Sequence, residues 1–558
     1  MKGVFGEFSR TVGLRKCFKM SGVSREAPVG IQCLQRLCTW LCPRMQINRL
    51  RWYQASVLLL TYLTYMTYHL TRKPISVVKS VLHQNCSNVP PPPGFHPDPD
   101  DDQWCNWAPF NTPDANTLLG ALDSAFLFSY ASAMFVSGMI AERVDLRYFL
   151  SFGMLFSAIF SYLFGIGRTY GIHHITYYLL VQAGAGVAQT TGWPGTVAIV
   201  GKWFGNTKKG LIFGIWNSHT SLGNILGTLM AAAFVERDWA LSFVYPGLVM
   251  GAVAFLVFLF LAPEPRHVGL TPPGDRSSPS RQSRRSAEEE DEPAQVIVGD
   301  QAASLRANRH STNAPQPEQP EDEATEHTSL LGPNSAQSSA ISLGRALAIP
   351  GVIEFSLSLF FAKLVSYTFL YWLPLYINNS TDLTPKQSGR LSTLFDVGGV
   401  VGAILAGYVA DHSACPALVC VGFYALCAPS LLVYQRWGSS SYSTNVFLLM
   451  ATGALVNGPY ALITTAVSAE LGTHSSLSGS AQALATVTAI IDGTGSVGAA
   501  IGPLVAGVVS GESWSSVFYM LITCDVMALI LLLRIAKCEI IKWRQDRRMN
   551  SPRLVRIE

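Results

Sequence analysis

The stretch TYLTYMTYHLTRKPISVVKS, residues 61–80, restricts the folds that this chain can adopt. It starts inside an apolar run and then places Arg72, Lys73 and Lys79 along the same segment. An arginine at the centre of a bilayer costs about 2.5 to 3.5 kcal/mol on insertion scales, so such a residue turns toward protein or a water-filled cavity. We therefore expect this stretch to be one helix of a multi-helix membrane protein.

The composition of the whole chain agrees with a membrane protein. Its 558 residues are 49% hydrophobic and only 14% charged, whereas soluble domains carry about 25% charged residues. The formal net charge of +4 is too small to indicate nucleic acid as a partner. The eleven cysteines form no CxxC pair and no Cys/His cluster with zinc spacing, so we expect neither a metal site nor a cofactor.

Twelve apolar runs of roughly 20 to 30 residues are long enough to cross a bilayer as helices. They lie at residues 53–82, 118–141, 146–167, 174–203, 209–235, 240–262, 348–377, 388–411, 416–436, 443–470, 481–510 and 514–537. The segment after the sixth run is rich in Ser, Pro, Glu and Arg, so we expect it to be disordered. The predicted organisation is a basic arm at 1–52, six helices at 53–262, a linker at 263–345, six helices at 346–537 and a basic tail at 538–558.

The distribution of Lys and Arg predicts the orientation in the membrane. The N-terminal arm, the loops ERVDLR and GKWFGNTKKG, the linker and the C-terminal tail would all lie on one side, and most of them are basic. Short basic loops remain in the cytosol, so we expect both termini there. The first loop on the other side has no Lys or Arg and carries the sequon at Asn85. Together with the sequon at Asn378, it predicts glycosylation on a lumenal side, where Cys86 and Cys105 could also pair.

Three short motifs recur in the same order at offsets of about 270 residues. GALDSAF at 120 resembles GRLSTLF at 389, GMIAER at 138 resembles GYVADH at 407, and SLGNILG at 221 resembles SVGAAIG at 496. Two such repeats predict two six-helix bundles related by a pseudo-two-fold axis. A substrate site is then expected at the interface of the bundles, near the middle of the membrane.

The first span carries a polar stripe at steps of four, three, four and three residues: Tyr65, His69, Arg72, Ser76 and Lys79. These steps place all five side chains on one helix face, which should point into the protein. An alternative is that Arg72 and Lys73 end a short helix before Pro74 and extend to the lumenal interface.

The seventh span offers a second buried cation. Lys363 is followed at helical spacing by Tyr367, and it occupies a place similar to that of Arg72 when the two repeats are aligned. We expect Arg72 and Lys363 to face each other across the pseudo-symmetry axis. Two opposed cations favour a dianion, and a phosphomonoester carries about −1.5 to −2 charges at pH 7. Inorganic phosphate and sugar phosphates fit best, while sulfate and dicarboxylates remain open.

Other polar residues lie where such a site would need them. The fourth span has a stripe of Gln182, Gly186, Gln189 and Trp193, and the fifth places Asn217, His219 and Asn224 within two turns. His219 could contact substrate, because histidine titrates near neutral pH. Intramembrane His and Asn also bridge helices, which is the alternative. Asp396 and Asp492 are interpreted as counter-ions or packing residues.

Several motifs resemble one transporter family. GWPGTVAIVGKWFGNTKKGLIFGIWNSHTSLGNILG, residues 192–227, resembles the signature of the organophosphate:phosphate antiporters of the major facilitator superfamily. YHLTRKPISVVKS at 68, FAKLVSYTFLYWLPLYI at 361 and TVTAIIDGTGSVGAAIGPL at 486 are similar to the sugar-phosphate exchangers of the vertebrate endoplasmic reticulum. The resemblance implies the major facilitator fold and exchange of glucose 6-phosphate, or a related sugar phosphate, for inorganic phosphate.

The resemblance also implies site residues. Arg72 matches the basic residue of the first helix through TRK, Trp193 matches the GWP position, and His219 is the nearest match to the His of the WNxxH pattern, which reads WNSH here. Lys363 is the nearest match for the second cation, although the family places it six residues before a Trp, where this chain has Ser366. The predicted substrate site comprises Tyr65, His69, Arg72, Trp193, Asn217, His219, Lys363 and Tyr367.

Rival functions make different predictions. A membrane enzyme is not expected, because the sequence offers no set of nucleophile, base and orienting residue. A proton-coupled organic-anion symporter and a nutrient receptor that does not transport its ligand remain alternatives. The resemblance implies the endoplasmic reticulum membrane, whereas the acidic dileucine pattern EHTSLL at 326–331 makes the endolysosomal membrane the second choice.

Overall fold

The computed structural model describes residues 27–34, 48–88, 103–141, 143–204, 218–271, 343–472 and 481–549, with the single positions 91, 98, 101 and 216. Within these ranges, every regular element is a helix. The predicted contact Asn217, the dileucine pattern, most of the linker and most of the N-terminal arm lie outside the described residues.

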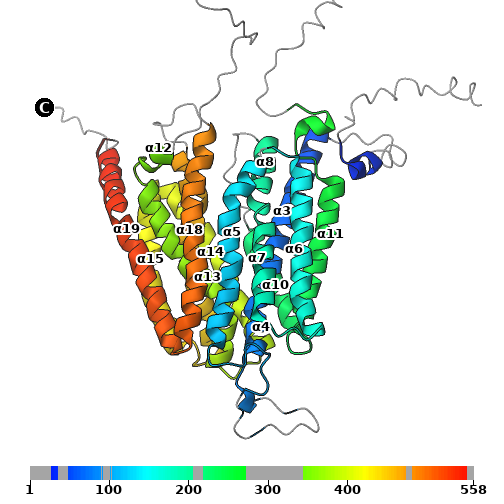
Figure 1. Cartoon of the computed structure of the whole chain (residues 1–558). Coiled ribbons are helices and arrows are strands. Elements are labelled where there is room, and N and C mark those ends of the chain that lie inside the picture. Colours follow the sequence, from blue (N-terminus) through cyan, green and yellow to red (C-terminus); the bar gives the residue numbers. More distant parts are fainter. Residues whose placement is uncertain are drawn as a thin grey trace, which may run out of the picture. The chain divides into compact units, whose positions relative to one another are not determined.

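The first set of helices corresponds to the six spans predicted at residues 53–262 (Figure 1). It consists of α3 (Arg49–Arg72), α4 (Pro74–Leu82), α5 (Ala115–Ala141), α6 (Leu146–Thr169), α7 (Ile175–Gln189), α8 (Gly192–Phe204), α10 (His219–Phe234) and α11 (Leu241–Phe260).

The second set corresponds to the six spans predicted at residues 346–537. It consists of α13 (Val352–Ser380), α14 (Pro385–Ser413), α15 (Pro416–Trp437), α16 (Tyr442–Leu462), α18 (Ala481–Ser510) and α19 (Trp514–Met549). Short elements flank them: α12 (Leu343–Leu347), a π-helical turn η3 (Ile463–Val467) and α17 (Ser468–Gly472).

Nine helices of the described ranges are long and apolar enough to cross a membrane. The other three predicted spans coincide with α3 and α4, with α7 and α8, and with α10. Two of these are divided into shorter helices, and α3 carries several Thr together with His69 and Arg72. The first and fourth spans are thus excluded by a helix break, together with the polar residues of α3 in the first, and the fifth because its described helix, α10, has only 16 residues.

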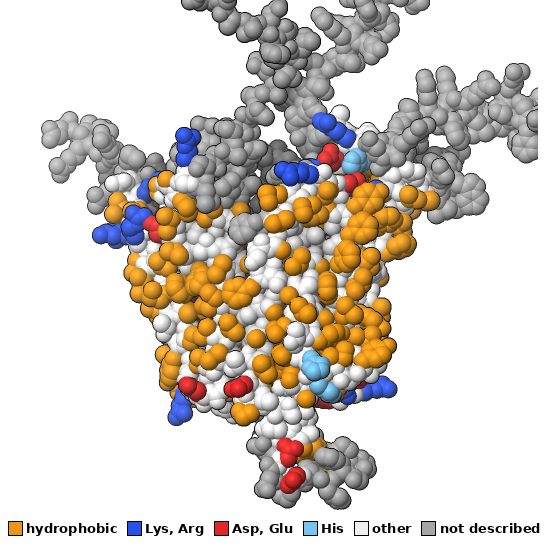
Figure 2. All heavy atoms as spheres, in the orientation of Figure 1, with side chains coloured by type: hydrophobic (Ala, Val, Ile, Leu, Met, Phe, Trp, Pro, Cys, Tyr) orange, Lys and Arg blue, Asp and Glu red, His pale blue; other side chains and the backbone are white. Residues whose placement is uncertain are grey.

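The outer surface separates apolar from charged side chains (Figure 2). Hydrophobic side chains cover the middle of the visible face, and most of the visible Lys, Arg, Asp and Glu side chains lie near its two ends. Large exposed side chains such as Phe152, Leu248 and Ile404 contribute to the apolar surface. Such a band suits a bilayer, in which exposed charges are costly.

The first span is interrupted at Lys73. Helix α3 ends at Arg72 and α4 begins at Pro74, because proline lacks the N–H that a continuous helix needs and fits the first helical position. The continuous helix expected from the spacing is thus broken by one residue. The alternative, in which the cations extend to the interface, is wrong: Arg72 is 6% exposed and Lys73 is 3% exposed.

Helix α19 is longer than the apolar run predicts. The run ends at residue 537, but the helix continues to Met549. Glu539 on this extension accepts hydrogen bonds from the backbone N–H groups of Ala417 (3.0 Å) and Leu418 (2.9 Å) at the start of α15. The extension therefore satisfies N–H groups that the first turn of a helix leaves unpaired.

The two sets contact each other at one end, which we call the disulfide end because the Cys86–Cys105 disulfide lies there. The opposite end, where α11 stops and α13 begins, is the linker end. Helix α5 packs against α18 (Figure 1), and the contacts between residues show that α10 packs against α14. At the disulfide end, Gly389 lies against Ala232 and Val77 of the first set, and a side chain there would crowd them.

Candidate functional site

Arg72 is a buried cation without a carboxylate partner. Its Nε donates to Oε1 of Gln189 at 2.6 Å, and its guanidinium lies 4.8 Å from the ring centre of Tyr130 and 5.6 Å from that of Phe126. It forms no ion pair with any Asp or Glu of the described ranges. Aromatic faces attract a cation but do not neutralise it, so Arg72 keeps a positive charge available to an anion.

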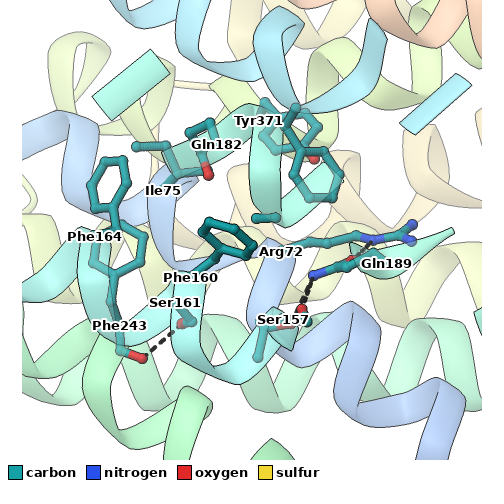
Figure 3. Close-up of a pocket in the computed structure, with 13 residues that line it drawn as sticks. Arg72, Ile75, Ser157, Phe160, Ser161, Phe164, Gln182, Gln189, Phe243 and Tyr371 are labelled. Carbon is teal, nitrogen blue, oxygen red and sulfur yellow. Dashed lines mark hydrogen bonds between the residues drawn. The ribbon is translucent and has the colours of Figure 1, made fainter. Parts of the chain in front are cut away.

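Gln189 is itself held in one orientation. Its Nε2 donates to Oγ1 of Thr71 at 3.1 Å and to Oγ of Ser157 on α6 at 3.0 Å (Figure 3). Its carbonyl oxygen must therefore face Nε of Arg72. With Nε engaged, the two terminal nitrogens of the guanidinium form the fork that can bind an anion.

The cavity drawn in Figure 3 lies beside Arg72 and is not large enough for a sugar phosphate. Its volume is about 20 Å³, which suits one water molecule, whereas small-molecule sites measure about 300 to 1,000 Å³. We interpret it as a packing void behind the arginine. Its lining includes Ile75, Phe160, Phe164, Gln182 and Phe243.

Lys363, the second predicted cation, is buried and already paired. Its Nζ lies 2.8 Å from Oδ1 of Asp492 on α18 and 3.4 Å from both the carbonyl of Asp492 and Oγ of Ser496. The ring centre of Tyr460 lies 5.9 Å away. Asp492 is thus a counter-ion, which agrees with one of the two interpretations of the sequence.

Four tyrosines connect the surroundings of the two cations: Tyr65, Tyr130, Tyr367 and Tyr460, which we call the tyrosine cluster. Tyr130 interacts electrostatically with Arg72 and with both Lys363 and Asp492. Tyr367 likewise interacts with Arg72 and with Lys363. Arg72 and Lys363 therefore lie within electrostatic reach of the same hydroxyl groups, one from each set of helices.

A polar chain crosses from the first set to the second. Nδ1 of His69 lies 3.2 Å from Oδ1 of Asn224, whose Nδ2 donates to Oδ1 of Asp396 on α14 at 3.2 Å. Nζ of Lys73 lies 3.4 Å from Oδ2 of Asp396 and donates to the carbonyl of Leu370 at 3.2 Å. For His69 and Asn224, the helix-bridging alternative describes the observed contacts.

His219 lies in an aromatic group of the first set. Its ring centre is 4.6 Å from that of Tyr65 and 4.4 Å from that of Trp216, while Trp193 lies 5.3 Å from Tyr65. Nδ1 of His219 contacts Oγ1 of Thr220 at 3.1 Å. Its Nε2 is buried and has no hydrogen-bond partner among the described residues. A buried polar atom without a partner is costly, which makes this nitrogen a candidate ligand contact.

The structure brings most of the predicted residues into two neighbouring groups that share Tyr65. One group surrounds Arg72 and the tyrosine cluster, and the other surrounds His219. Sequence reasoning missed Tyr130, Tyr460 and Ser157, because single tyrosines and serines in apolar helices give no periodic signal. It also missed the carboxylate partner of Lys79, which is Asp123, at the disulfide end.

Two repeated sets of membrane helices that enclose paired charges are the architecture of secondary transporters. The model of the Major Facilitator Superfamily matches residues 108–489. The chain is 51% identical to the glucose-6-phosphate exchanger SLC37A2 of Bos taurus over 89% of this chain and 96% of the relative. It is 49% identical to SLC37A2 of Homo sapiens and 45% identical to the glucose-6-phosphate exchanger SLC37A1 of Homo sapiens. Both alignments cover 89% of this chain and 95% of the relative. The chain therefore belongs to the Major Facilitator Superfamily and, within it, to the family of these exchangers.

Solved structures support the fold alone. A bacterial homologue of the lysosomal transporter Spinster, in an inward-facing and unoccupied conformation, aligns with a TM-score of 0.57 at 13% identity, covering 88% of this chain and 97% of that one. A D-xylose–proton symporter aligns with a TM-score of 0.54 at 11% identity, covering 87% and 97%.

Proposed function

We propose that this protein exchanges a sugar phosphate, with glucose 6-phosphate as the first candidate, for inorganic phosphate across a membrane. The observation that carries the proposal is Arg72, a buried and oriented guanidinium that pairs with no carboxylate of the described residues. The names of the relatives, which share up to 51% of their residues with this chain, support the same substrate.

Most of the predicted residues have a role in this proposal. The terminal nitrogens of Arg72 bind the phosphoryl oxygens, because a planar fork suits bidentate contact with phosphate. Lys363 contributes the second cation from the other set of helices, and Tyr367 and the rest of the tyrosine cluster donate hydroxyl groups. Nε2 of His219 and the ring of Trp193 contact the sugar, with Tyr65 between the two groups.

Exchange rather than one-way transport follows from the charge of the site. Without an anion, closing both ends would bury the positive charge of Arg72, and such burial is costly. A bound phosphoryl group removes that cost and can contact both sets of helices. A ligand shifts a conformational equilibrium only through its different affinity for the two states, so these contacts must tighten on closure. Occupied protein should then change state much faster than empty protein.

Reconstituted vesicles test this proposal. Vesicles loaded with phosphate should take up labelled glucose 6-phosphate roughly ten-fold faster than unloaded vesicles, because each cycle returns with an anion. Equal rates would contradict exchange. Uptake driven by a pH gradient would favour the proton-coupled symporter, and binding without uptake would favour the receptor.

We further propose that the protein resides in the endoplasmic reticulum membrane, with the endolysosomal membrane as second choice, and that the disulfide end faces the lumen. Asn85 is exposed, and its Oδ1 accepts a hydrogen bond from the backbone N–H of Ser87 at 3.1 Å. Asn378 is half-buried within α13, where its Nδ2 donates to the carbonyl of Leu383 at 2.8 Å. Asn85 is thus the better acceptor.

Glycosylation at Asn85 can be checked by gel mobility. Asn85→Gln should remove the mobility shift that an N-glycosidase produces in protein made in animal cells, whereas Asn378→Gln should leave it, because the amide of Asn378 is engaged. A shift that survives Asn85→Gln would contradict the assignment. Loss of the shift in Asn85→Gln also places the disulfide end in the lumen.

A further inference from the structure

Four cations lie buried along α3, α4 and α13, and three of them have a carboxylate partner. The pairs are Lys73 with Asp396, Lys79 with Asp123, and Lys363 with Asp492. The carboxylates differ in exposure: the side chain of Asp492 is 25% exposed, that of Asp396 is 8% and that of Asp123 is 0%. Among these pairs, only the Asp492 carboxylate reaches open space while holding a buried lysine.

Asp492 lies beside the proposed substrate site, because it contacts Lys363, whose Nζ is 5.9 Å from the ring centre of Tyr460 in the tyrosine cluster. Another member of the cluster, Tyr130, has its ring centre 4.8 Å from the guanidinium of Arg72. The contact of Asp492 with Nζ of Lys363 at 2.8 Å has the length of a charge-assisted hydrogen bond. A phosphoryl oxygen that used Lys363 would need this same ammonium group.

We propose that Asp492 sets the affinity of the site by competing with the phosphoryl group of the substrate for Lys363. The inference rests on the proposed function and refines it. In the empty site, the carboxylate of Asp492 occupies the position on Lys363 that a phosphoryl oxygen would use, and it neutralises the charge of Lys363. An arriving phosphate must either displace the carboxylate or bind beside it, and two anions so close repel each other.

This competition has a consequence for transport. The charge of Arg72 is not neutralised by a carboxylate of the described residues, so it attracts the anion directly. Lys363 can bind the anion only when its ion pair with Asp492 breaks. The substrate is then held less tightly than two open cations would hold it. Because tight binding to one state slows departure, weaker binding favours release on the other side of the membrane. Asp492 would thus lower the affinity for the substrate and raise the rate of transport.

The test compares Asp492→Asn with the wild type by two independent measurements. One is the half-saturation concentration of inorganic phosphate for thermal stabilisation in detergent, which depends on binding but not on transport. The other is the concentration dependence of phosphate–phosphate exchange in vesicles. Asp492→Asn should lower both half-saturation values by about ten-fold, equivalent to about 1.4 kcal/mol, and should lower the maximal exchange rate. Asp492→Glu, which keeps the carboxylate, should return both toward the wild type.

Asp525→Asn is the matched control. Asp525 is also a buried carboxylate of the second set, but it lies on α19 rather than on α18. Its replacement should leave the half-saturation for phosphate unchanged. In a Lys363→Gln background, Asp492→Asn should give a clearly smaller gain, because the contested ammonium group is absent. This comparison separates competition for Lys363 from a general change in charge.

The outcomes separate this inference from the proposed function. If the wild type exchanges phosphate and Asp492→Asn shows an unchanged or higher half-saturation in both measurements, the competition is refuted and exchange stands. If the wild type binds phosphate without exchanging it, the proposed function fails, and a gain in binding by Asp492→Asn still supports the competition. If phosphate does not stabilise the wild type at any concentration, both are overturned.

Discussion

Replacing Arg72 with alanine should lower the exchange rate by about two to three orders of magnitude. Truncating one partner of a buried charged pair costs about 2 to 5 kcal/mol, since the other charge is left without compensation. In the proposed site, that other charge is the phosphate. Initial rates of phosphate–phosphate exchange in vesicles, normalised to the amount of protein inserted, give the measurement.

Replacing Arg72 with lysine separates charge from geometry. Lysine keeps the positive charge but loses both the planar fork and the hydrogen bond to Gln189. We expect the exchange rate of Arg72→Lys to lie between the rate of Arg72→Ala and that of the wild type. Arg168→Lys is the matched control, because Arg168 is partly exposed and pairs with Asp238 at 2.7 Å outside the proposed site. An Arg72→Ala protein that is correctly folded and keeps more than about a tenth of the exchange rate would contradict the role of Arg72.

Much of the fold follows from the sequence, because the bilayer imposes a simple rule on apolar runs. Every predicted span overlaps between one and three helical elements of the described residues. The break at Lys73 was also signalled, since Pro74 interrupts the pattern, but the spacing of polar residues favoured a continuous helix. The extension of α19 was not predictable from apolarity. It is stabilised by contacts between Glu539 and the start of α15, far away in the sequence.

The site was predictable to a lesser extent. A cation inside an apolar run must face inward, so the burial of Arg72 and Lys363 follows from elementary electrostatics. Which carboxylate pairs with which cation does not follow, because the partners are distant along the chain. Lys363 and Asp492 are separated by 129 residues, and Lys73 meets Asp396 across the two sets. The repeat argument placed two cations near one axis but could not reveal that one of them is already neutralised.

At the disulfide end, Lys79 joins the first set of helices to the second. Its Nζ lies 3.9 Å from the ring centre of Trp372 and donates to the carbonyl of Tyr371 at 3.3 Å. Its ion-pair partner, Asp123, belongs to its own set and would stay with it when the sets separate. When the disulfide end opens, Lys79 therefore loses its contacts with Trp372 and Tyr371 but keeps its ion pair with Asp123. A desolvated cation–π contact contributes about 2 kcal/mol or more.

Trp372→Leu should consequently shift the equilibrium toward the state open at the disulfide end by about thirty-fold, which corresponds to roughly 2 kcal/mol. A cysteine introduced at Ala232, which is fully buried beside Gly389, reports the opening. Its reaction with a membrane-impermeant thiol reagent applied from the disulfide side should accelerate in the Trp372→Leu background. Because Trp372 also donates to the carbonyl of Pro503, general loosening of the second set must be separated from opening.

Two further variants make that separation. Trp514→Leu removes an indole that packs 6.2 Å from Trp372 within the second set, so it loosens the same cluster without touching the cation. Lys79→Met combined with Asp123→Asn removes the cation together with its carboxylate, which avoids leaving either charge buried alone. If the cation–π contact closes this end, the double variant reproduces the faster labelling and Trp514→Leu does not. Equal labelling in Trp514→Leu and Trp372→Leu would instead assign the effect to packing within the second set.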